Sequence, residues 1–207
     1  MNKIITIGRE FGSGGREFGR RLAEELGIEY YDKEIITAIA EKTSMSQEYV
    51  QEVLEGKPHH LYPITIGQSM FIADNYYIQQ EQSIYLAQSE IIRELAQKSS
   101  CVIVGRCADF ILKDLRPYRI FVYADLDSRI KRCILRNSNA QKFLSEKEIK
   151  KQILTIDKNR AKYYEYYTGN DWGDKNNYDL CVNTTDVVIK EIVPIIAKMF
   201  WLINLII

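Results

Sequence analysis

The chain lacks several features that would assign it to a protein class at once. Its 207 residues contain only two histidines and four cysteines, and no cysteines are spaced as a Cys-x-x-Cys pair. A zinc site of the usual spacing is therefore not expected. The thiols of Cys101, Cys107, Cys133 and Cys181 lie in or beside apolar runs, so we expect free, buried cysteines in a reducing cytoplasm.

The chain also has no excess of charge of either sign, because 28 Lys and Arg residues balance 28 Asp and Glu residues. Nucleic-acid binding, which usually needs a basic excess, is therefore not predicted. No apolar run is long enough to cross a membrane, and the N-terminus enters a strand without the pattern of a signal peptide. The apolar segment 200–207 is expected to be either the buried end of a last helix or a surface for homo-oligomer formation.

The most informative segment present is residues 1–20, MNKIITIGREFGSGGREFGR. Residues 4–7 predict a buried strand, residues 12–15 a glycine-rich turn, and residues 16–26, with apolar side chains at helical spacing, a helix. A strand, a glycine turn and a helix in this order are typical of a phosphate-binding loop. In such a loop, backbone N–H groups and the helix N-terminus hold phosphate oxygens.

The usual pattern for this loop, G-x-x-x-x-G-K-[ST], is not met. If Gly15 is its second glycine, the lysine position holds Arg16 and the hydroxyl position Glu17; if Gly14 is, the lysine position holds Gly15. In neither register does the first position hold glycine. Arg16 would bring a cation to the phosphates as a planar fork, and Ser13 is the candidate magnesium ligand. A turn without any ligand is the alternative.

The remaining pattern alternates strands and helices, which predicts an α/β fold with a mostly parallel sheet flanked by helices. Segment 56–66, with two prolines, is expected to be a loop. We expect strands at about 3–7, 29–31, 101–104, 119–123 and 178–182, and helices at about 15–26, 33–42, 46–54, 76–98, 126–137, 145–167 and from 186.

Polar residues follow several of these strands. In parallel sheets, ligands bind beyond the carboxyl ends of the strands, so Asp32, Lys33, Arg106 and Asp109 are expected near one site. The fork of Arg106 suits a phosphate, although an ion pair with Asp109 is the alternative. Asp32 is expected to bind magnesium or position an acceptor, or else to serve as a helix N-cap.

The charged helix at 145–167 has two interpretations. It is either a solvated surface helix or a mobile lid that brings Arg160 over the phosphates. It carries four tyrosines, of which we expect at most one to contact a ligand, because aromatic residues at this spacing usually pack. These are Tyr163, Tyr164, Tyr166 and Tyr167.

Five segments carry a resemblance to a known family: residues 5–27, 30–34, 101–112, 157–169 and 178–184. Through them the chain resembles the cytidylate kinase-like family of bacteria, a divergent branch of the nucleoside monophosphate kinases. The resemblance implies a three-layer P-loop kinase fold with a five-stranded sheet in a single domain, 1–207. Its parts would be a core (about 1–32, 99–140 and 176–207), an acceptor-binding arm (about 33–98) and a lid (about 141–175).

The resemblance also implies a reaction, transfer of the γ-phosphoryl group of ATP to a nucleoside monophosphate with magnesium, with CMP or dCMP favoured. The partners would then be small nucleotides. Catalytic roles would fall to Arg16, Arg106, Asp157 and Arg160. The donor would be held by Gly12, Ser13, Gly14, Gly15, Arg16, Glu17 and Arg132. The acceptor would be held by Asp32, Lys33, Arg106, Asp109, Asp157 and Arg160.

The chain departs from the family pattern at several positions besides the loop lysine. Ala38 stands about where the arm has an arginine, and Ile153 replaces a lid arginine. Two other functions therefore stay open: a kinase of a different small metabolite, and a nucleotide-binding protein without kinase activity.

Overall fold

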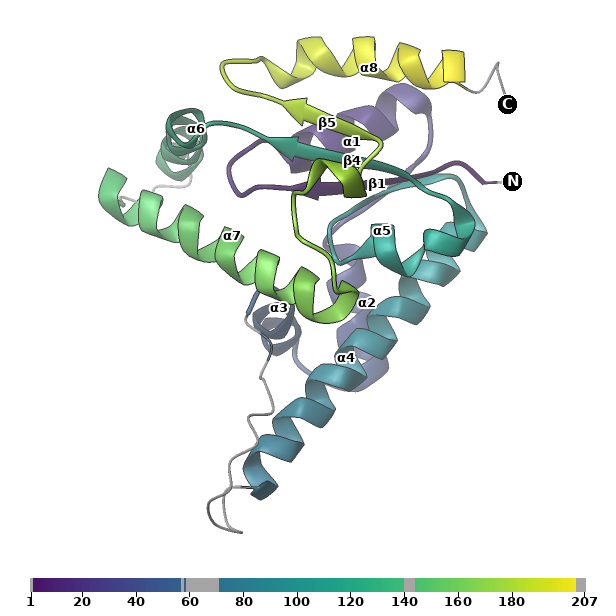
Figure 1. The fold of residues 1–207 in the computed structure, drawn as a ribbon, viewed down its shortest axis with the longest axis vertical. Helices are drawn as coiled ribbons and strands as arrows, with labels where there is room; N and C mark the ends of the chain where they lie inside the picture. Colours follow the sequence, from purple (N-terminus) through teal and green to yellow (C-terminus); the bar gives the residue numbers. More distant parts are fainter. Residues whose placement is uncertain (1, 57, 59–70, 140–143, 204–207) are drawn as a thin grey trace.

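A five-stranded sheet organises the molecule. The computed structural model describes residues 2–56, 58, 71–139 and 144–203. All strand pairs are parallel and the order is β2-β3-β1-β4-β5 (Figure 1). The strands are β1 (Ile4–Arg9), β2 (Glu29–Tyr31), β3 (Cys101–Val104), β4 (Tyr118–Tyr123) and β5 (Leu180–Asn183). The predicted α/β class and parallel sheet are confirmed.

The central strand β1 determines where a ligand can bind. The chain first builds β2 and β3 on one side of β1 and then crosses to β4 and β5 on the other. In open α/β sheets this reversal beside a strand's carboxyl end is the usual place for a ligand. The strand runs further than predicted, because Gly8 and Arg9 still pair with Phe121 and Val122 of β4. Arg9 therefore lies at the binding edge.

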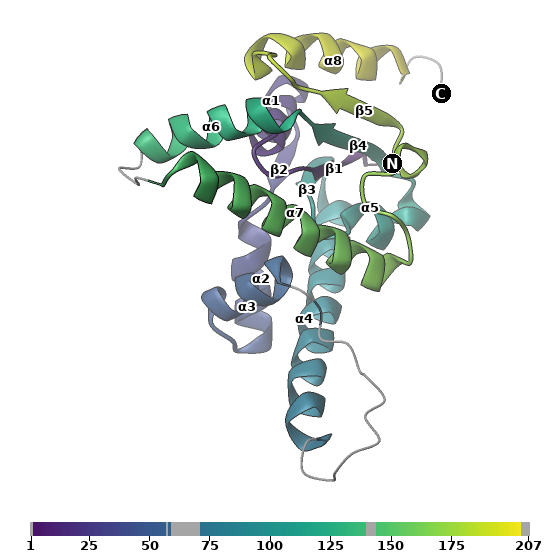
Figure 2. The ribbon, with the colours of Figure 1, turned by 60° about the vertical axis from the view of Figure 1, so that its left-hand side comes forward.

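Helices cover both faces of the sheet (Figure 2). One face packs against α1 and α8, and the other against α2, α4, α5 and part of α7. Helix α6 packs on α7. The helices are α1 (Gly15–Leu26), α2 (Glu34–Thr43), α3 (Gln47–Glu55), α4 (Phe71–Lys98), α5 (Ala108–Ile111), α6 (Leu126–Asn139), α7 (Glu146–Thr168) and α8 (Ile189–Ile203).

Local sequence explains the two helices that matter most for the site. Helix α1 buries Phe18 and Leu22 against the sheet and ends at Gly27, whose left-handed backbone (φ 64°) closes the last turn. Helix α7 begins at a capping box, in which Ser145 and Glu148 satisfy each other's backbone N–H groups. Both helices begin within a residue of their predicted starts.

Some expectations differ from the structure or fall outside it. Helix α4 begins at Phe71 rather than near residue 76, and the short helix α5 was not predicted. Most of the expected loop at 56–66 lies outside the described residues, as do residues 204–207 of the apolar tail. Within that tail Phe200 is buried and Leu202 is exposed. None of the helices, as far as their residues are described, is long and apolar enough to span a bilayer.

We expect Leu22→Ala to lower the free energy of unfolding by about 2–5 kcal/mol, because the fully buried side chain leaves a cavity between α1 and the sheet. Leu154→Ala is the matched control, since that side chain is 49% exposed on α7 and should change stability by less than about 0.5 kcal/mol. Urea unfolding measures both. Equal losses in the two variants would contradict the assigned core.

Candidate active site

The glycine turn forms a loop between β1 and α1. Gly12 and Gly14 have left-handed backbones (φ 80° and 83°), and α1 begins at Gly15 with Gly14 as its N-cap. The first N–H groups of α1 have no partner within the helix and carry its partial positive charge. They border a cavity of about 460 Å³ between the loop and α6, lined in part by Arg9, Gly12, Gly14, Gly15, Arg16, Glu17, Arg132, Arg136 and Arg160. We call it the loop cavity.

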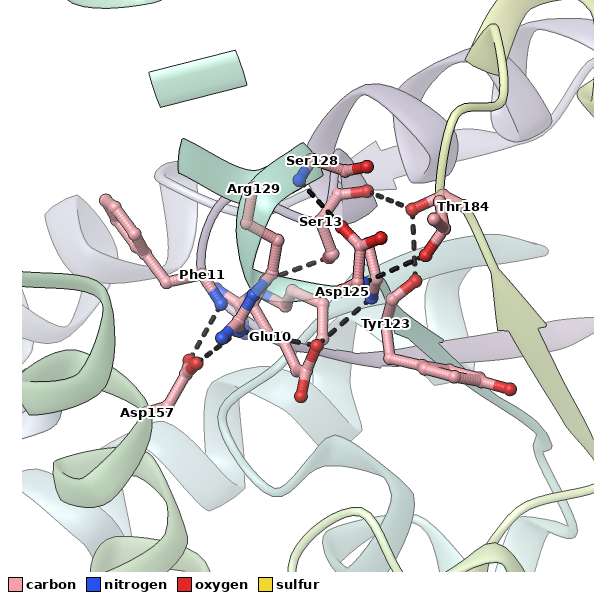
Figure 3. Close-up of polar contacts among 12 residues, drawn as sticks. Glu10, Phe11, Ser13, Tyr123, Asp125, Ser128, Arg129, Asp157 and Thr184 are labelled. Carbon is pink, nitrogen blue, oxygen red and sulfur yellow. Dashed lines mark hydrogen bonds and ion pairs between the residues drawn. The ribbon is translucent and has the colours of Figure 1, made fainter. Parts of the chain in front are cut away.

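The loop is fastened to the helices beside it by a buried polar network (Figure 3). The Phe11 N–H donates to Asp157 Oδ1 on α7 at 2.7 Å, and Arg129 on α6 donates to Asp157 Oδ2 at 2.5 Å. Arg129 also lies 3.3 Å from Glu10, which accepts a hydrogen bond from Ala124 N–H. Burial raises the pKa of the Glu10 carboxyl. Asp157 thus connects the loop to α7.

A group of arginines surrounds the buried carboxylate of Asp32 at the end of β2. Arg16 Nε lies 2.8 Å from Asp32 Oδ2, and Arg9 Nη2 lies 4.0 Å from Oδ1. Arg106 donates twice to the Asp32 carbonyl oxygen, at 3.2 and 3.1 Å. Arg160 reaches in from α7 and donates to the carbonyl oxygen of Arg9 at 3.2 Å. We call these four side chains the arginine cluster.

The arginine cluster carries more positive charge than its carboxylates neutralise. Burial lowers the pKa of Arg9, Arg106 and Arg160, and for Arg9 the nearby guanidinium of Arg160 lowers it further. Besides Asp32, the carboxylates near the cluster in the described part of the chain include Asp157, 3.8 Å from Arg160 and already bound to Arg129, and Glu55, whose charge acts on Arg106 and Arg160. Buried cations need anions close by. A phosphate accepts forked hydrogen bonds from guanidinium groups and would supply the negative charge that the arginine cluster lacks.

A strained turn holds Arg106 in place. Gly105, Arg106 and Cys107 follow β3 and all have left-handed backbones, with φ of 75°, 59° and 52°. A non-glycine residue in this conformation costs about 1–3 kcal/mol and persists only where its surroundings enforce it. Here the Arg106 carbonyl accepts a hydrogen bond from Gln88 on α4 at 3.1 Å. Such strain is concentrated at ligand sites.

A second, smaller cavity of about 60 Å³ lies on the other side of the arginine cluster. We call it the α7 cavity. Its lining includes Gly105, Arg106, Gln88, Asp109, Tyr163, Tyr164, Trp172 and Tyr178. Among the described residues, Arg9 and Arg160 alone line both cavities, so their side chains form the wall between them.

Two of the alternatives for the acidic residues are wrong. Lys33, not Asp32, is the N-cap residue of α2, and the Asp32 carboxylate faces arginines instead. The carboxylate of Asp109 accepts a hydrogen bond from Tyr164 at 2.6 Å, and no ion pair joins it to Arg106 in the described part of the chain. Arg106 is therefore not neutralised by Asp109.

The other predicted site residues are placed as follows. The Ser13 hydroxyl is buried and donates to the Glu10 carbonyl at 2.9 Å. Arg132 donates to the carbonyl oxygen of Val187 at 3.2 Å and reaches that of Ser13 at 3.5 Å. Lys33 is exposed and lines neither cavity.

No magnesium site of the protein's own is visible in the described residues. They contain no group of three or more His, Cys, Asp or Glu side chains that could hold a metal ion. The Ser13 side chain is fully buried, and its hydroxyl donates to the Glu10 carbonyl. Magnesium bound through Ser13 stays a prediction.

The tyrosines of α7 mostly pack, as expected. Tyr167 stacks on Tyr85 at 3.9 Å between ring centroids and meets Tyr166 edge to face. Tyr163 and Tyr164 are buried and line the α7 cavity. Whether more than one contacts a ligand stays untested.

Sequence reasoning missed Arg9. The residue follows the apolar run of β1 and occupies the first glycine position of the loop pattern when Gly14 is its second glycine. The sequence did offer a sign of its importance, because a charged residue at position 9 is neither a glycine of the pattern nor part of the apolar run.

Comparisons with known proteins agree with this fold. Solved structures with the same fold include shikimate kinases from Acinetobacter baumannii (TM-score 0.54, 16% identity, 97% of this chain and 93% of that one) and Bacteroides thetaiotaomicron (0.57, 15%, 96% and 98%). An uncharacterised protein from Eubacterium ventriosum matches with a TM-score of 0.66 and 30% identity over 96% of this chain and 98% of that one. The fold is that of the P-loop kinases.

The family is shown by sequence. Residues 4–186 match the model of the cytidylate kinase-like family, and the chain belongs to that family. Proteins named cytidylate kinase are similar in Methanopyrus kandleri (27% identity, 89% of this chain, 86% of that protein) and Staphylothermus marinus (25%, 94% of each). The chain is thus a kinase-like phosphotransferase by family.

The Asp109 carboxyl should make the free energy of unfolding depend on pH in a way that can be measured. Burial raises its pKa in the folded state, so the folded protein keeps this proton to a higher pH than the unfolded chain. The stability that the Asp109 carboxyl contributes is lost as the pH rises above its pKa in the unfolded chain. Asn cannot ionise, so the free energy of unfolding of Asp109→Asn should rise relative to that of wild type by up to about 1.4 kcal/mol per pH unit between about pH 4 and the raised pKa of the folded state, and the difference should stay constant above it.

Urea unfolding of both proteins between pH 3.5 and 7.5 measures this difference. Asp114→Asn is the control, because that carboxylate is 67% exposed beside Arg93. A difference between wild type and Asp109→Asn that stays constant or shrinks across the whole of that range would contradict a raised pKa.

Proposed function

We propose that the protein transfers the γ-phosphoryl group of ATP to a nucleoside monophosphate, with CMP or dCMP favoured as acceptor. The observation that carries this proposal is the arginine cluster between the loop cavity and the α7 cavity. Phosphoryl transfer needs two phosphate-bearing ligands held in line and charge neutralisation between them. Membership of the cytidylate kinase-like family supports both the donor and the class of acceptor.

The loop cavity is the proposed donor site. The backbone N–H groups of residues 12–15 and the start of α1 would hold the donor phosphates. Arg16, whose side chain is 39% exposed toward this cavity, would neutralise their charge. Arg132 supports the loop through its contacts with the Ser13 and Val187 carbonyls. Glu17 lines the cavity mouth and pairs with Arg21 at 2.7 Å.

The α7 cavity is the proposed acceptor site, and it would have to widen beyond its present volume of about 60 Å³ to admit a whole nucleotide. Arg106 would grip the acceptor phosphate, with Asp32 holding the arginine cluster in register. Tyr163 and Trp172 offer aromatic surfaces for a base. The names of the two curated relatives favour a cytidine nucleotide.

The reaction needs no proton removed from the acceptor. A phosphate oxygen of the monophosphate attacks the γ-phosphorus, the bond to the β,γ-bridging oxygen breaks, and ADP leaves with the electron pair. Magnesium, carried mainly by the ATP phosphates, would neutralise charge on them. Arg160 would contact the transferred group from the wall between the cavities. Asp157 holds Phe11 N–H and Arg129, so it would position α7 rather than touch the substrate.

A second candidate is a kinase of a different small metabolite. Ala38 stands where a base-reading arginine is expected, and it packs against the core beside α2 instead of presenting a charge. The acceptor cavity therefore has one recognition group fewer than the family pattern implies.

A panel of acceptors tests both candidates. We expect MgATP to raise the melting temperature, and CMP or dCMP to raise it further, because both ligands bind the folded state. ADP release should then require ATP and the monophosphate together. If no nucleoside monophosphate gives ADP while shikimate or another small alcohol does, the second candidate replaces the first; activity on AMP or UMP but not on CMP or dCMP would overturn the preference for cytidine alone. Binding of ATP with no turnover on any acceptor would favour a nucleotide-binding protein.

Arg106→Ala tests the acceptor side. Loss of a forked, charge-assisted contact of about 1.5–3 kcal/mol should raise the KM for the acceptor at least tenfold and leave the KM for ATP within about threefold. Arg93→Ala is the matched control, since Arg93 is exposed on α4 and pairs with Asp114. Steady-state kinetics at varied acceptor concentration measure both. An unchanged acceptor KM in a folded Arg106→Ala would remove Arg106 from the site.

A further inference from the structure

We infer that Arg9 supplies the cation that the phosphate-binding loop lacks, and that Gly15 occupies the lysine position of the loop pattern. This inference rests on the proposed function and adds to it a catalytic group that touches the transferred phosphoryl group. It also decides between the two registers that the sequence leaves open.

The register follows from the packing of two positions against each other. When Gly14 is the second glycine of G-x-x-x-x-G-K-[ST], the first glycine position falls on Arg9 and the lysine position on Gly15. A Cβ atom added to Gly15 would lie 2.5 Å from the Cβ atom of Arg9, closer than side chains approach. Only one of these two positions can therefore carry a side chain. The pattern has its side chain, a lysine, at the position of Gly15, whereas this chain has its side chain, Arg9, at the position of the first glycine.

The Arg9 side chain then runs to the place where a loop cation is needed. Its stem crosses Gly15, and its guanidinium lies so close to Gly105 that a Cβ atom there would collide with Nη1. It faces Asp32 at 4.0 Å, a weak pairing, while its buried Nε finds no acceptor within the described part of the chain. The guanidinium is thus held in position by packing, with hydrogen-bonding capacity left over.

The position between the cavities distinguishes Arg9 from Arg16. Arg9 lines both the loop cavity and the α7 cavity, whereas Arg16 lines the loop cavity alone. Arg16 Nε forms an ion pair with Asp32 Oδ2 at 2.8 Å, closer than the 4.0 Å of Arg9, although neither Nε makes a hydrogen bond in the described part of the chain; the Arg16 side chain is three times as exposed, 39% against 13%. A group that passes from one cavity to the other must pass the wall formed by Arg9 and Arg160. Charge that develops on that group is therefore better neutralised by Arg9 than by Arg16.

Burial strengthens the interaction of the Arg9 guanidinium with an anion and also disfavours its charged form. Burial, and after it the charge of the neighbouring arginines, disfavours the charged form of Arg9 and lowers its pKa. An arriving phosphoryl group relieves that repulsion, so the interaction is strongest when negative charge is greatest. This is the behaviour expected of a group that stabilises a transition state rather than the free enzyme.

The first experiment separates the charge of Arg9 from its packing. Arg9→Met keeps an apolar stem over Gly15 and removes the charge, whereas Arg9→Lys keeps both. We expect Arg9→Met to lower kcat about a hundredfold or more, Arg9→Lys to lower it less, and both to melt within a few degrees of wild type. Arg20→Ala, an exposed arginine of α1 paired with Glu24, should leave kcat within twofold.

Two results would overturn the role of Arg9. One is a folded Arg9→Met with kcat within threefold of wild type. The other is a larger loss of kcat in Arg16→Ala than in Arg9→Met, because Arg16 would then be the loop cation. Both are measured at saturating ATP and acceptor, so that weaker binding does not mimic slower transfer.

The second experiment tests the exchange of positions. Gly15→Lys alone should lower the melting temperature and abolish turnover, because the new side chain meets Arg9. In Arg9→Gly/Gly15→Lys the crowding is gone and the loop pattern is restored, so kcat should exceed that of Arg9→Gly at least tenfold. A folded double variant no more active than Arg9→Gly would show that position 15 is not the lysine position.

A third measurement keeps this inference separate from the proposed function. If wild type transfers no phosphoryl group to any acceptor, the proposed function fails. Binding of inorganic tripolyphosphate, measured by calorimetry, then decides the role of Arg9. We expect Arg9→Met to weaken it at least tenfold and Arg20→Ala to leave it unchanged; equal binding by wild type and Arg9→Met would overturn the inference.

Discussion

The carboxylate of Asp32 is the charge on which the candidate site depends. It lies buried at the end of β2, and Arg9 and Arg16 both turn to it while Arg106 binds its backbone carbonyl. A single carboxylate permits several guanidinium groups to stay near one another without neutralising them all. The surplus positive charge is what a phosphate would meet. Burial and glycine packing keep these groups from turning outward to solvent.

The sheet order makes this arrangement possible. Strands β2 and β3 bring Asp32 and Arg106 to one side of β1, and the loop after β1 presents the start of α1 between them. Helix α7, far along the chain, is then fixed over the loop through Asp157 and contributes Arg160. Apart from Asp157 and Arg160, which lie three residues apart on α7, these side chains are far from one another in sequence. Helix α7 is therefore not an independent flap in this structure, because its Asp157 carboxylate accepts a hydrogen bond from the loop.

Much of the fold could be predicted from the sequence, because it rests on local patterns. The apolar runs of β1, β3 and β4, the glycine turn and the Ser145 capping box each have a signature within a few residues. The division into core, arm and lid, and every assigned ligand contact, stays a prediction. The role of Asp32 was harder to read, because an aspartate just before a helix resembles an N-cap until its distant arginine partners are known. Arg9 was missed for the same reason, since its importance comes from contacts across the sheet with Gly105 and Asp32.

The packing of Arg9 has a consequence for how this sequence can change over time. Its stem occupies the space above Gly15 and its head the space above Gly105, so the three positions exclude one another's alternatives. A side chain gained at either glycine is blocked while the arginine is present, and loss of the arginine alone leaves a void among buried charges. Substitutions at Arg9, Gly15 and Gly105 are therefore expected to be coupled, so descendants of this chain should keep the three residues together or replace them together.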